Sequence, residues 1–77
     1  MKITLKYGGN SIDWEAIVEL NEVIENELSC IDANENLIVL REFTNHQAAV
    51  DARIKLIDLV SKAVEGGVVI EIIIDDL

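Results

Sequence analysis

The chain has few of the residues that mark the common classes of small protein. It has 77 residues, no proline and one cysteine, so an internal disulfide is excluded. Basic residues are also scarce, because six Lys and Arg stand against 15 Asp and Glu and give a formal net charge of −9. Nucleic acids and anionic membranes need a basic surface, so neither is expected as a direct partner. The charge favours a basic protein partner.

Long apolar segments and aromatic side chains are missing as well. No apolar run approaches the roughly 18 residues that span a membrane. Met1 and Lys2 lead into an alternating segment rather than the apolar core of a signal peptide, so we expect a cytoplasmic protein. With one Trp, one Tyr and one Phe, the chain lacks the stacking residues of an RNA-binding sheet.

Apolar aliphatic residues, by contrast, are abundant. Hydrophobic residues make up 51% of the sequence, although 27% of it is charged. A chain of this length forms one small domain, here residues 1–77, and buries only about 60% of the surface that its unfolded form exposes. The sequence therefore has more apolar residues than one small core uses, which predicts a homo-oligomer.

The segment 68–74 (VVIEIII) is the one around which the fold is expected to form. Six of its seven residues are apolar and β-branched. A strand with one wet face alternates apolar with polar residues, whereas a near-continuous Val/Ile run is typical of a strand covered on both faces. We expect a helix layer on one face and a second chain over much of the other.

The remaining elements follow from their periodicity. Alternation over Lys2–Tyr7 predicts a strand that ends at Gly8-Gly9-Asn10. Apolar residues at steps of three and four predict an amphipathic helix over residues 11–28. Thr44 and Gln47 form a capping box, which predicts a second helix from there to about residue 65. Its core row is expected to be Val50, Ile54, Ile57 and Val64, broadened by Ala49, Leu56, Val60 and Ala63.

The fold depends on how residues 29–33 behave before the predicted strand Leu37–Phe43. If they pair with that strand, the order is βαββαβ; if they only connect, it is a three-stranded βαβαβ. We favour the first, an α/β (α+β) two-layer sandwich with two helices on one face of a mostly antiparallel sheet, similar in architecture to ferredoxin-like domains. The protein would then self-associate through the open face of this sheet or through its edge strand. The residues expected there are Ile38, Leu40, Val69 and Ile73.

The helix predicted over residues 11–28 has an unusual polar face, because this segment contains no Lys or Arg. Like charges spaced three or four residues apart cost a helix about 0.2–0.5 kcal/mol per pair. Such a face is often only a solvated surface. Alternating charges would give the same solubility without that cost, so we also expect a partner-binding surface. Its residues are Glu15, Glu19, Glu22 and Glu25.

Residues with catalytic or ligand-binding potential are few. The segment 8–11 (GGNS) lies between a strand and an expected helix, but it lacks the spacing of a phosphate-binding loop. Cys30 and His46 are the only soft ligands, and a nucleophilic pair would also need an orienting third group. Glu71 and the acids at 75–76 lack the spaced oxygens of a calcium loop. We expect no enzyme, no metal and no cofactor.

These observations predict a non-enzymatic, acidic protein-interaction or regulatory domain that self-associates and binds a basic protein. A specific form of this hypothesis is an inhibitor that imitates the charge of nucleic acid. Two alternatives stay open: a regulatory domain that senses a small ligand at a dimer interface, and a designed scaffold without biological function.

Overall fold

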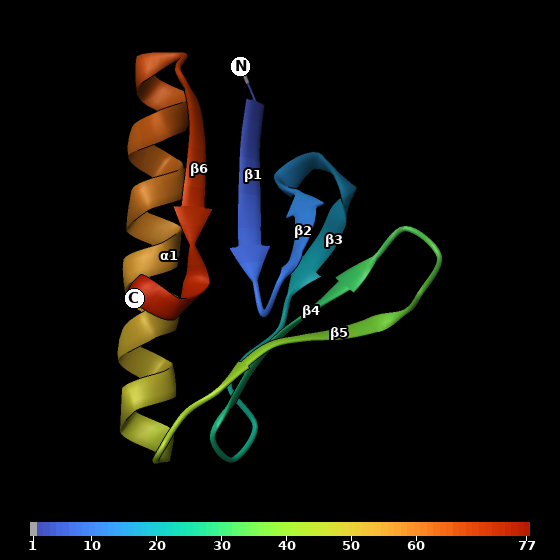
Figure 1. Cartoon of the computed structure of the whole chain (residues 1–77), viewed down its shortest axis with the longest axis vertical. Coiled ribbons are helices and arrows are strands. Elements are labelled where there is room, and N and C mark those ends of the chain that lie inside the picture. The colour runs from blue at the N-terminus through green and yellow to red at the C-terminus, as the bar shows by residue number, and fades with distance from the viewer. Residues whose placement is uncertain (1) are drawn as a thin grey trace.

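The computed structural model of the chain describes residues 2–77, and these residues form two small sheets and one long helix (Figure 1). The first sheet has the strand order β2-β1-β6 and the second has the order β3-β4-β5. The strands are β1 (Lys2–Tyr7), β2 (Asn10–Asp13), β3 (Ile17–Leu20), β4 (Glu27–Asp32), β5 (Leu37–Glu42) and β6 (Val69–Ile73), the helix is α1 (His46–Gly66), and the short 3-10 turns are η1 (Trp14–Ala16) and η2 (Ile74–Asp76).

The predicted ferredoxin-like βαββαβ fold is wrong, and so is the three-stranded βαβαβ alternative. Both require a helix over residues 11–28, but this segment forms β2, η1 and β3. The same residues also alternate between apolar and acidic, since an acid separates Ile12 from Trp14 and another separates Val18 from Leu20. β-branched side chains and uncompensated like charges weaken a helix here, so strand pairing prevails.

The turn after β1 explains how the chain enters β2. Tyr7 pairs with Asn10, which leaves Gly8 and Gly9 as a two-residue hairpin loop. Both glycines have positive φ, 48° and 82°. This is the conformation of a type I′ turn, which reverses the chain into an antiparallel strand. The glycine segment therefore closes a hairpin instead of preceding a helix, and the geometry of a phosphate-binding loop does not arise.

The second sheet contains the hairpin whose existence the sequence left open. Residues 29–32 belong to β4, which pairs antiparallel with β5. The Asp32 carboxylate closes the intervening turn by accepting hydrogen bonds from the backbone N–H groups of Asn34 and Asn36, each at 2.9 Å. Glu35 adopts a positive φ of 63° in this turn. The tip of this hairpin, between β4 and β5, points away from α1 (Figure 1).

The helix was predicted in nearly the right place, but its N-cap differs and only part of its predicted core is buried. The residues Ala49, Leu56, Val60 and Ala63 are buried as predicted, whereas the row Val50, Ile54, Ile57 and Val64 is not. Asn45 rather than Thr44 is the N-cap, because the Asn45 side chain accepts a hydrogen bond from the Ala48 N–H at 2.8 Å. At the other end, Gly67 has the left-handed conformation expected of a helix stop. The buried row consists of Ala49, Ala52, Leu56, Val60 and Ala63.

The buried core joins the helix to both sheets. Strand β6 lies at the edge of the first sheet, as expected, and pairs in parallel with β1. Helix α1 packs against β4 and β6. Inward-facing side chains from β1, β4, β5, β6 and η2 meet the helix there, and the cluster is Ile3, Leu5, Leu28, Cys30, Leu40, Leu56, Val60, Ala63, Ile72 and Ile74.

Candidate functional site

The four glutamates expected to form one helical face lie on three different segments. Glu15 is in η1, Glu19 is in β3, and Glu22 and Glu25 are in the loop between β3 and β4. All four are exposed, but the helix that was to align them is absent from residues 11–28. The prediction of a single acidic helix face is therefore wrong, and the β3–β4 loop retains two of its residues.

An open groove of about 300 Å³ separates the β3–β4 loop from the first half of α1. The loop contributes Glu22 and Val23, and the helix contributes four side chains. The lining is mixed, because Val23 and two aliphatic helix residues make its apolar part and Glu22, next to Val23 in the loop, supplies a carboxylate. The helix residues are His46, Val50, Arg53 and Ile54.

Two side chains of α1 hold the loop in place beside the helix. Arg53 donates from Nε to the Asn21 carbonyl at 2.8 Å and from Nη2 to the Leu20 carbonyl at 3.1 Å. The Nδ1 atom of His46 lies within hydrogen-bond distance of the Glu25 carbonyl. Glu25 itself has a positive φ of 57°, which is uncommon for a residue other than glycine. The wall of the groove is thus fixed by contacts with the helix.

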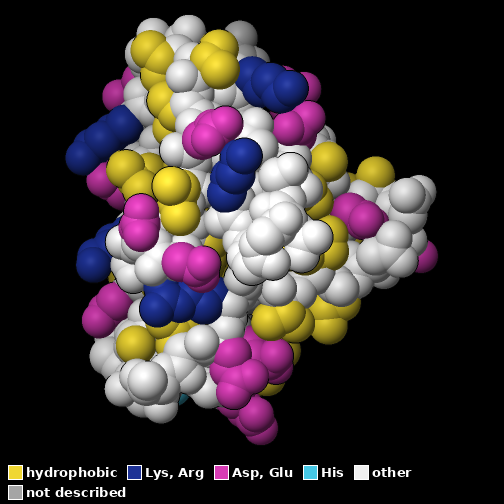
Figure 2. Space-filling view, in the orientation of Figure 1, with side chains coloured by type: hydrophobic (Ala, Val, Ile, Leu, Met, Phe, Trp, Pro, Cys, Tyr) yellow, Lys and Arg dark blue, Asp and Glu magenta, His cyan; other side chains and the backbone are white. Residues whose placement is uncertain are grey.

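The charge around this groove is strongly one-sided. Residues 7–40 contain no Lys or Arg. Glu27 and Glu42 are direct cross-strand partners in the second sheet, an arrangement in which like charges oppose each other. Figure 2 shows acidic side chains gathered at the end of the molecule where the β3–β4 loop lies. Arg53 lines the groove, but its guanidinium is directed to backbone carbonyls of the loop.

Large apolar side chains are exposed on the same segments. Ile24 is 68% exposed in the β3–β4 loop, Ile54 is 59% exposed on α1, and Val18 is 70% exposed in β3. The row that was expected to form the helix core, which includes Val50 and Ile54, instead faces outward beside the groove. Successive helical residues are about 100° apart, so a helix that buries Leu56 turns Ile54 to nearly the opposite side. The apolar residues of α1 cover a wider arc of the helix than its buried face, so the sequence alone did not show which of them are buried.

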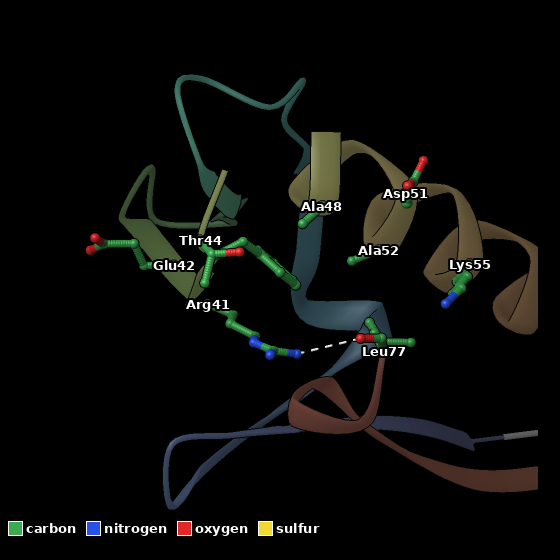
Figure 3. Close-up of a pocket in the computed structure, with 9 residues that line it drawn as sticks. Arg41, Glu42, Thr44, Ala48, Asp51, Ala52, Lys55 and Leu77 are labelled. Atoms are coloured by element: carbon green, nitrogen blue, oxygen red, sulfur yellow. Dashed lines mark hydrogen bonds between the residues drawn. The ribbon is translucent and has the colours of Figure 1, made fainter. Parts of the chain in front are cut away.

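A second, larger pocket of about 480 Å³ lies where β5, the first half of α1 and Leu77 meet (Figure 3). Arg41 forms one side of it and donates from Nη1 to the carbonyls of Ile74, Asp75 and Leu77 at 3.3, 3.1 and 3.4 Å. The Arg41 guanidinium also stacks 4.4 Å from the Phe43 ring centroid. In Figure 3, the carboxylates of Glu42 and Asp51 point away from the pocket.

This arrangement gives Arg41 a structural role. Its bonds tie β5 to the turn that follows β6, so the guanidinium is occupied by backbone oxygens. Thr44 and Lys55 are the other polar residues that line this pocket, besides the two carboxylates that point away from it. The pocket does not assemble several free donors around one point, as a specific site for a small anion would need.

The two candidate nucleophile residues lie in different environments. Cys30 is fully buried in β4, and burial, with a smaller contribution from the nearby Asp32 charge, raises the pKa of its thiol. A thiol with a raised pKa is a poor nucleophile at neutral pH. His46 is exposed at the start of α1, and no hydrogen bond joins it to Cys30 in the described structure. Residues 2–77 also contain no group of three or more His, Cys, Asp or Glu side chains arranged to hold a metal ion.

The residues predicted for self-association do not form one surface. Val69 and Ile73 lie on the outward face of β6 and are 73% and 48% exposed. Leu40 is buried in the core of the second sheet and Ile38 is half-buried beside it. The prediction is therefore wrong for Leu40 as an open-face residue, because the alternation of β5 turns Leu37 and Val39 outward instead.

Comparison of the chain with protein-family models, curated proteins and solved structures gave no match. Among residues 2–77, the single α-helix is not long and apolar enough to cross a membrane. What the protein does must therefore be inferred from its surfaces.

Proposed function

We propose that this chain is a non-enzymatic protein-interaction domain that binds a basic, partly apolar segment of another protein. The binding site is the groove between α1 and the β3–β4 loop. The observation that carries the proposal is the exposure of large aliphatic side chains directly beside uncompensated glutamates. A surface needed only for solubility gains nothing from exposed Ile24 and Ile54, whereas a protein-binding surface does.

The charge distribution indicates the chemistry of the partner. Glu22 lines the groove and Glu25 is exposed in the same loop, where its carbonyl meets His46. The cross-strand pair Glu27 and Glu42 belongs to the second sheet that this loop enters. Directly opposed like charges in a sheet destabilise it by roughly 0.2–1 kcal/mol. Lys or Arg side chains of a partner would relieve this repulsion and speed the encounter. Proteins that handle nucleic acid present such basic surfaces, so an inhibitor of one of them is a specific form of this proposal.

A charge-reversal comparison tests the groove. The probe is a synthetic amphipathic peptide of Lys and Leu carrying a fluorescent label, and the readout is its anisotropy during titration with the protein. The double variant Glu22→Lys/Glu25→Lys should weaken binding about tenfold or more, equivalent to about 1.4 kcal/mol. Raising the salt concentration should weaken binding to the unmodified chain, because salt screens exposed charges.

The control is the double variant Glu35→Lys/Glu65→Lys, which makes the same change in net charge at the hairpin tip and at the end of α1. It should weaken binding much less. Equal losses for the two double variants would show only a general charge effect and would refute the groove. A third variant, Ile54→Ser, should weaken binding without a change in charge, and unchanged binding would remove the apolar part of the proposal.

A further inference from the structure

Strand β6 is paired on one side only. Its five residues pair in parallel with residues 2–6 of β1 without a register shift. On its other side no strand or backbone group of residues 2–77 is paired with it. Half of the backbone N–H and C=O groups of such an edge strand are directed outward and can pair with another strand.

Three features that commonly protect an exposed edge, namely proline, lysine and a bulge, are missing from β6. The chain has no proline, β6 contains no lysine, and the pairing with β1 has no bulge. The strand has one charge, Glu71, whose carboxylate lies 3.9 Å from the Lys6 ammonium of its own sheet. Val69 and Ile73 flank it on the outward face and are exposed. Monomeric proteins normally protect a flat, apolar edge of this kind, so the edge is suited to pairing with another strand.

The sequence of β6 is nearly the same in both directions, and this identifies the occupant. Residues 69–73 read V-I-E-I-I, with Glu71 at the centre. We propose that β6 pairs antiparallel with β6 of a second copy of this chain, about a two-fold axis that passes beside Glu71. Such a pairing joins two three-stranded sheets into one continuous sheet. A two-fold interface brings the same surface of both copies together, so the apolar positions of this strand face one another and Glu71 lies at the axis.

The register follows from the symmetry. Ile70 lies opposite Ile72 of the second copy on the face that packs against α1, and Val69 lies opposite Ile73 of the second copy on the outward face. β-branched pairs of this kind stabilise neighbouring strands. The two Glu71 side chains meet at the axis, and each keeps Lys6 of its own chain nearby. The pairing uses none of the groove-lining residues, so it is independent of the proposed binding of a basic partner.

Charge does not prevent this association, although the chain carries a net charge of −9. The sheet that contains β6 also contains Lys2 and Lys6, and Lys2 lies 4.0 Å from Asp13. The acids of the proposed groove, Glu22 and Glu25, lie instead in the loop of the second sheet, although Asp75 and Asp76 directly follow β6. Association through β6 therefore keeps the acids of the groove out of the interface.

Site-directed cross-linking tests both the edge and the register. In the full chain, Glu71→Cys places two thiols next to each other across the axis, within reach of a disulfide between opposed strand residues. Mild oxidation should convert this variant to a covalent dimer, and mass spectrometry of its peptides should show position 71 joined to position 71. Ser11→Cys is the control, because Ser11 is exposed on the same outward face but lies on β2, at the far edge of the sheet. Cys30 is buried and is shared by both variants.

A charge-swap experiment provides a second measurement that does not depend on oxidation. Light scattering should show the unmodified chain becoming dimeric as its concentration rises, and Glu71→Lys alone should shift it toward monomer through repulsion between lysines. Mixing Glu71→Lys with the unmodified chain should restore dimers, because Glu71 then faces a lysine. Circular dichroism checks that both variants fold. A chain that stays monomeric, equal cross-linking by Ser11→Cys, or no recovery on mixing would overturn the proposal.

Discussion

Replacing Leu56 and Ile54 by alanine, one at a time, tests which face of α1 lies in the core. Leu56 is fully buried, whereas Ile54 is 59% exposed. Leu→Ala substitutions in a packed core cost about 2–5 kcal/mol. At roughly 0.05–0.15 kcal/mol per residue, a chain of 77 residues has a total stability of about 4–12 kcal/mol. Leu56→Ala should therefore remove a large part of it.

Ile54→Ala should behave very differently. Its side chain loses little buried area, and alanine is the better helix former by a few tenths of a kcal/mol. We expect a change within about 0.5 kcal/mol of zero, as for most exposed positions. With a urea dependence of about 1 kcal/mol per M, Leu56→Ala should lower the unfolding midpoint by 2 M or more, and Ile54→Ala should leave it nearly unchanged.

The assay is urea unfolding followed by circular dichroism at one fixed protein concentration, so that self-association contributes equally to each variant. Equal destabilisation by the two substitutions would refute the described packing. A larger loss for Ile54→Ala would mean that the row expected from the sequence, which includes Val50 and Ile54, forms the core after all.

Three further predictions concern local contacts. Asn45→Ala should cost about 1 kcal/mol of stability and Thr44→Ala much less, because Asn45 makes the helix cap; equal losses in thermal unfolding would contradict this. Arg53→Lys should cost about 1–2 kcal/mol, since lysine does not reproduce the two guanidinium hydrogen bonds, and an unchanged urea midpoint would count against their importance. Hydrogen bonds, chiefly from Asn36, hold the pKa of Asp32 below its ordinary value, so its stabilisation is present above the unfolded-state pKa and is lost as pH falls through the folded-state pKa. The stability difference between the unmodified chain and Asp32→Asn should therefore shrink in acid, and a constant difference would refute it.

Several elements were predictable because local pattern and final structure agree. The alternation of residues 2–7, the apolar strand that begins at Leu37 and the Val/Ile run before Asp75 all became strands. The helix between Asn45 and Gly67 also follows from local residues, since its glycine stop is as expected and its N-cap, Asn45, lies one residue beyond the predicted Thr44. In each case the local pattern identifies the element, although β6 pairs with β1 at the other end of the chain.

The segment 11–28 was mispredicted because its conformation depends on pairing with the strands on either side of it. Its apolar spacing fits a helix, and the same segment also alternates over shorter stretches. Ile12 becomes a strand residue by pairing with Leu5, and Leu20 does so by pairing with Cys30. These pairings, together with the two-glycine turn, outweigh helical spacing in a segment with no basic residue to support a helix.

The candidate site was predictable only in part for the same reason. The shortage of basic residues and the exposure of Glu22 and Glu25 follow from the sequence. The groove does not, because it depends on the rotation of α1 about its axis. That rotation is set by packing against β4 and β6, and it turns Val50 and Ile54 toward the β3–β4 loop.

The most direct test of the proposed function is an NMR titration of the isotope-labelled chain with the amphipathic Lys/Leu peptide. The amide signals of residues 21–26 and 46–54 should shift progressively and lie together on the walls of the groove. Signals of the β4–β5 turn and of the second half of α1 should stay nearly fixed. Shifts spread evenly over all acidic positions, or no shifts at millimolar peptide, would contradict the claim that this groove binds a basic partner.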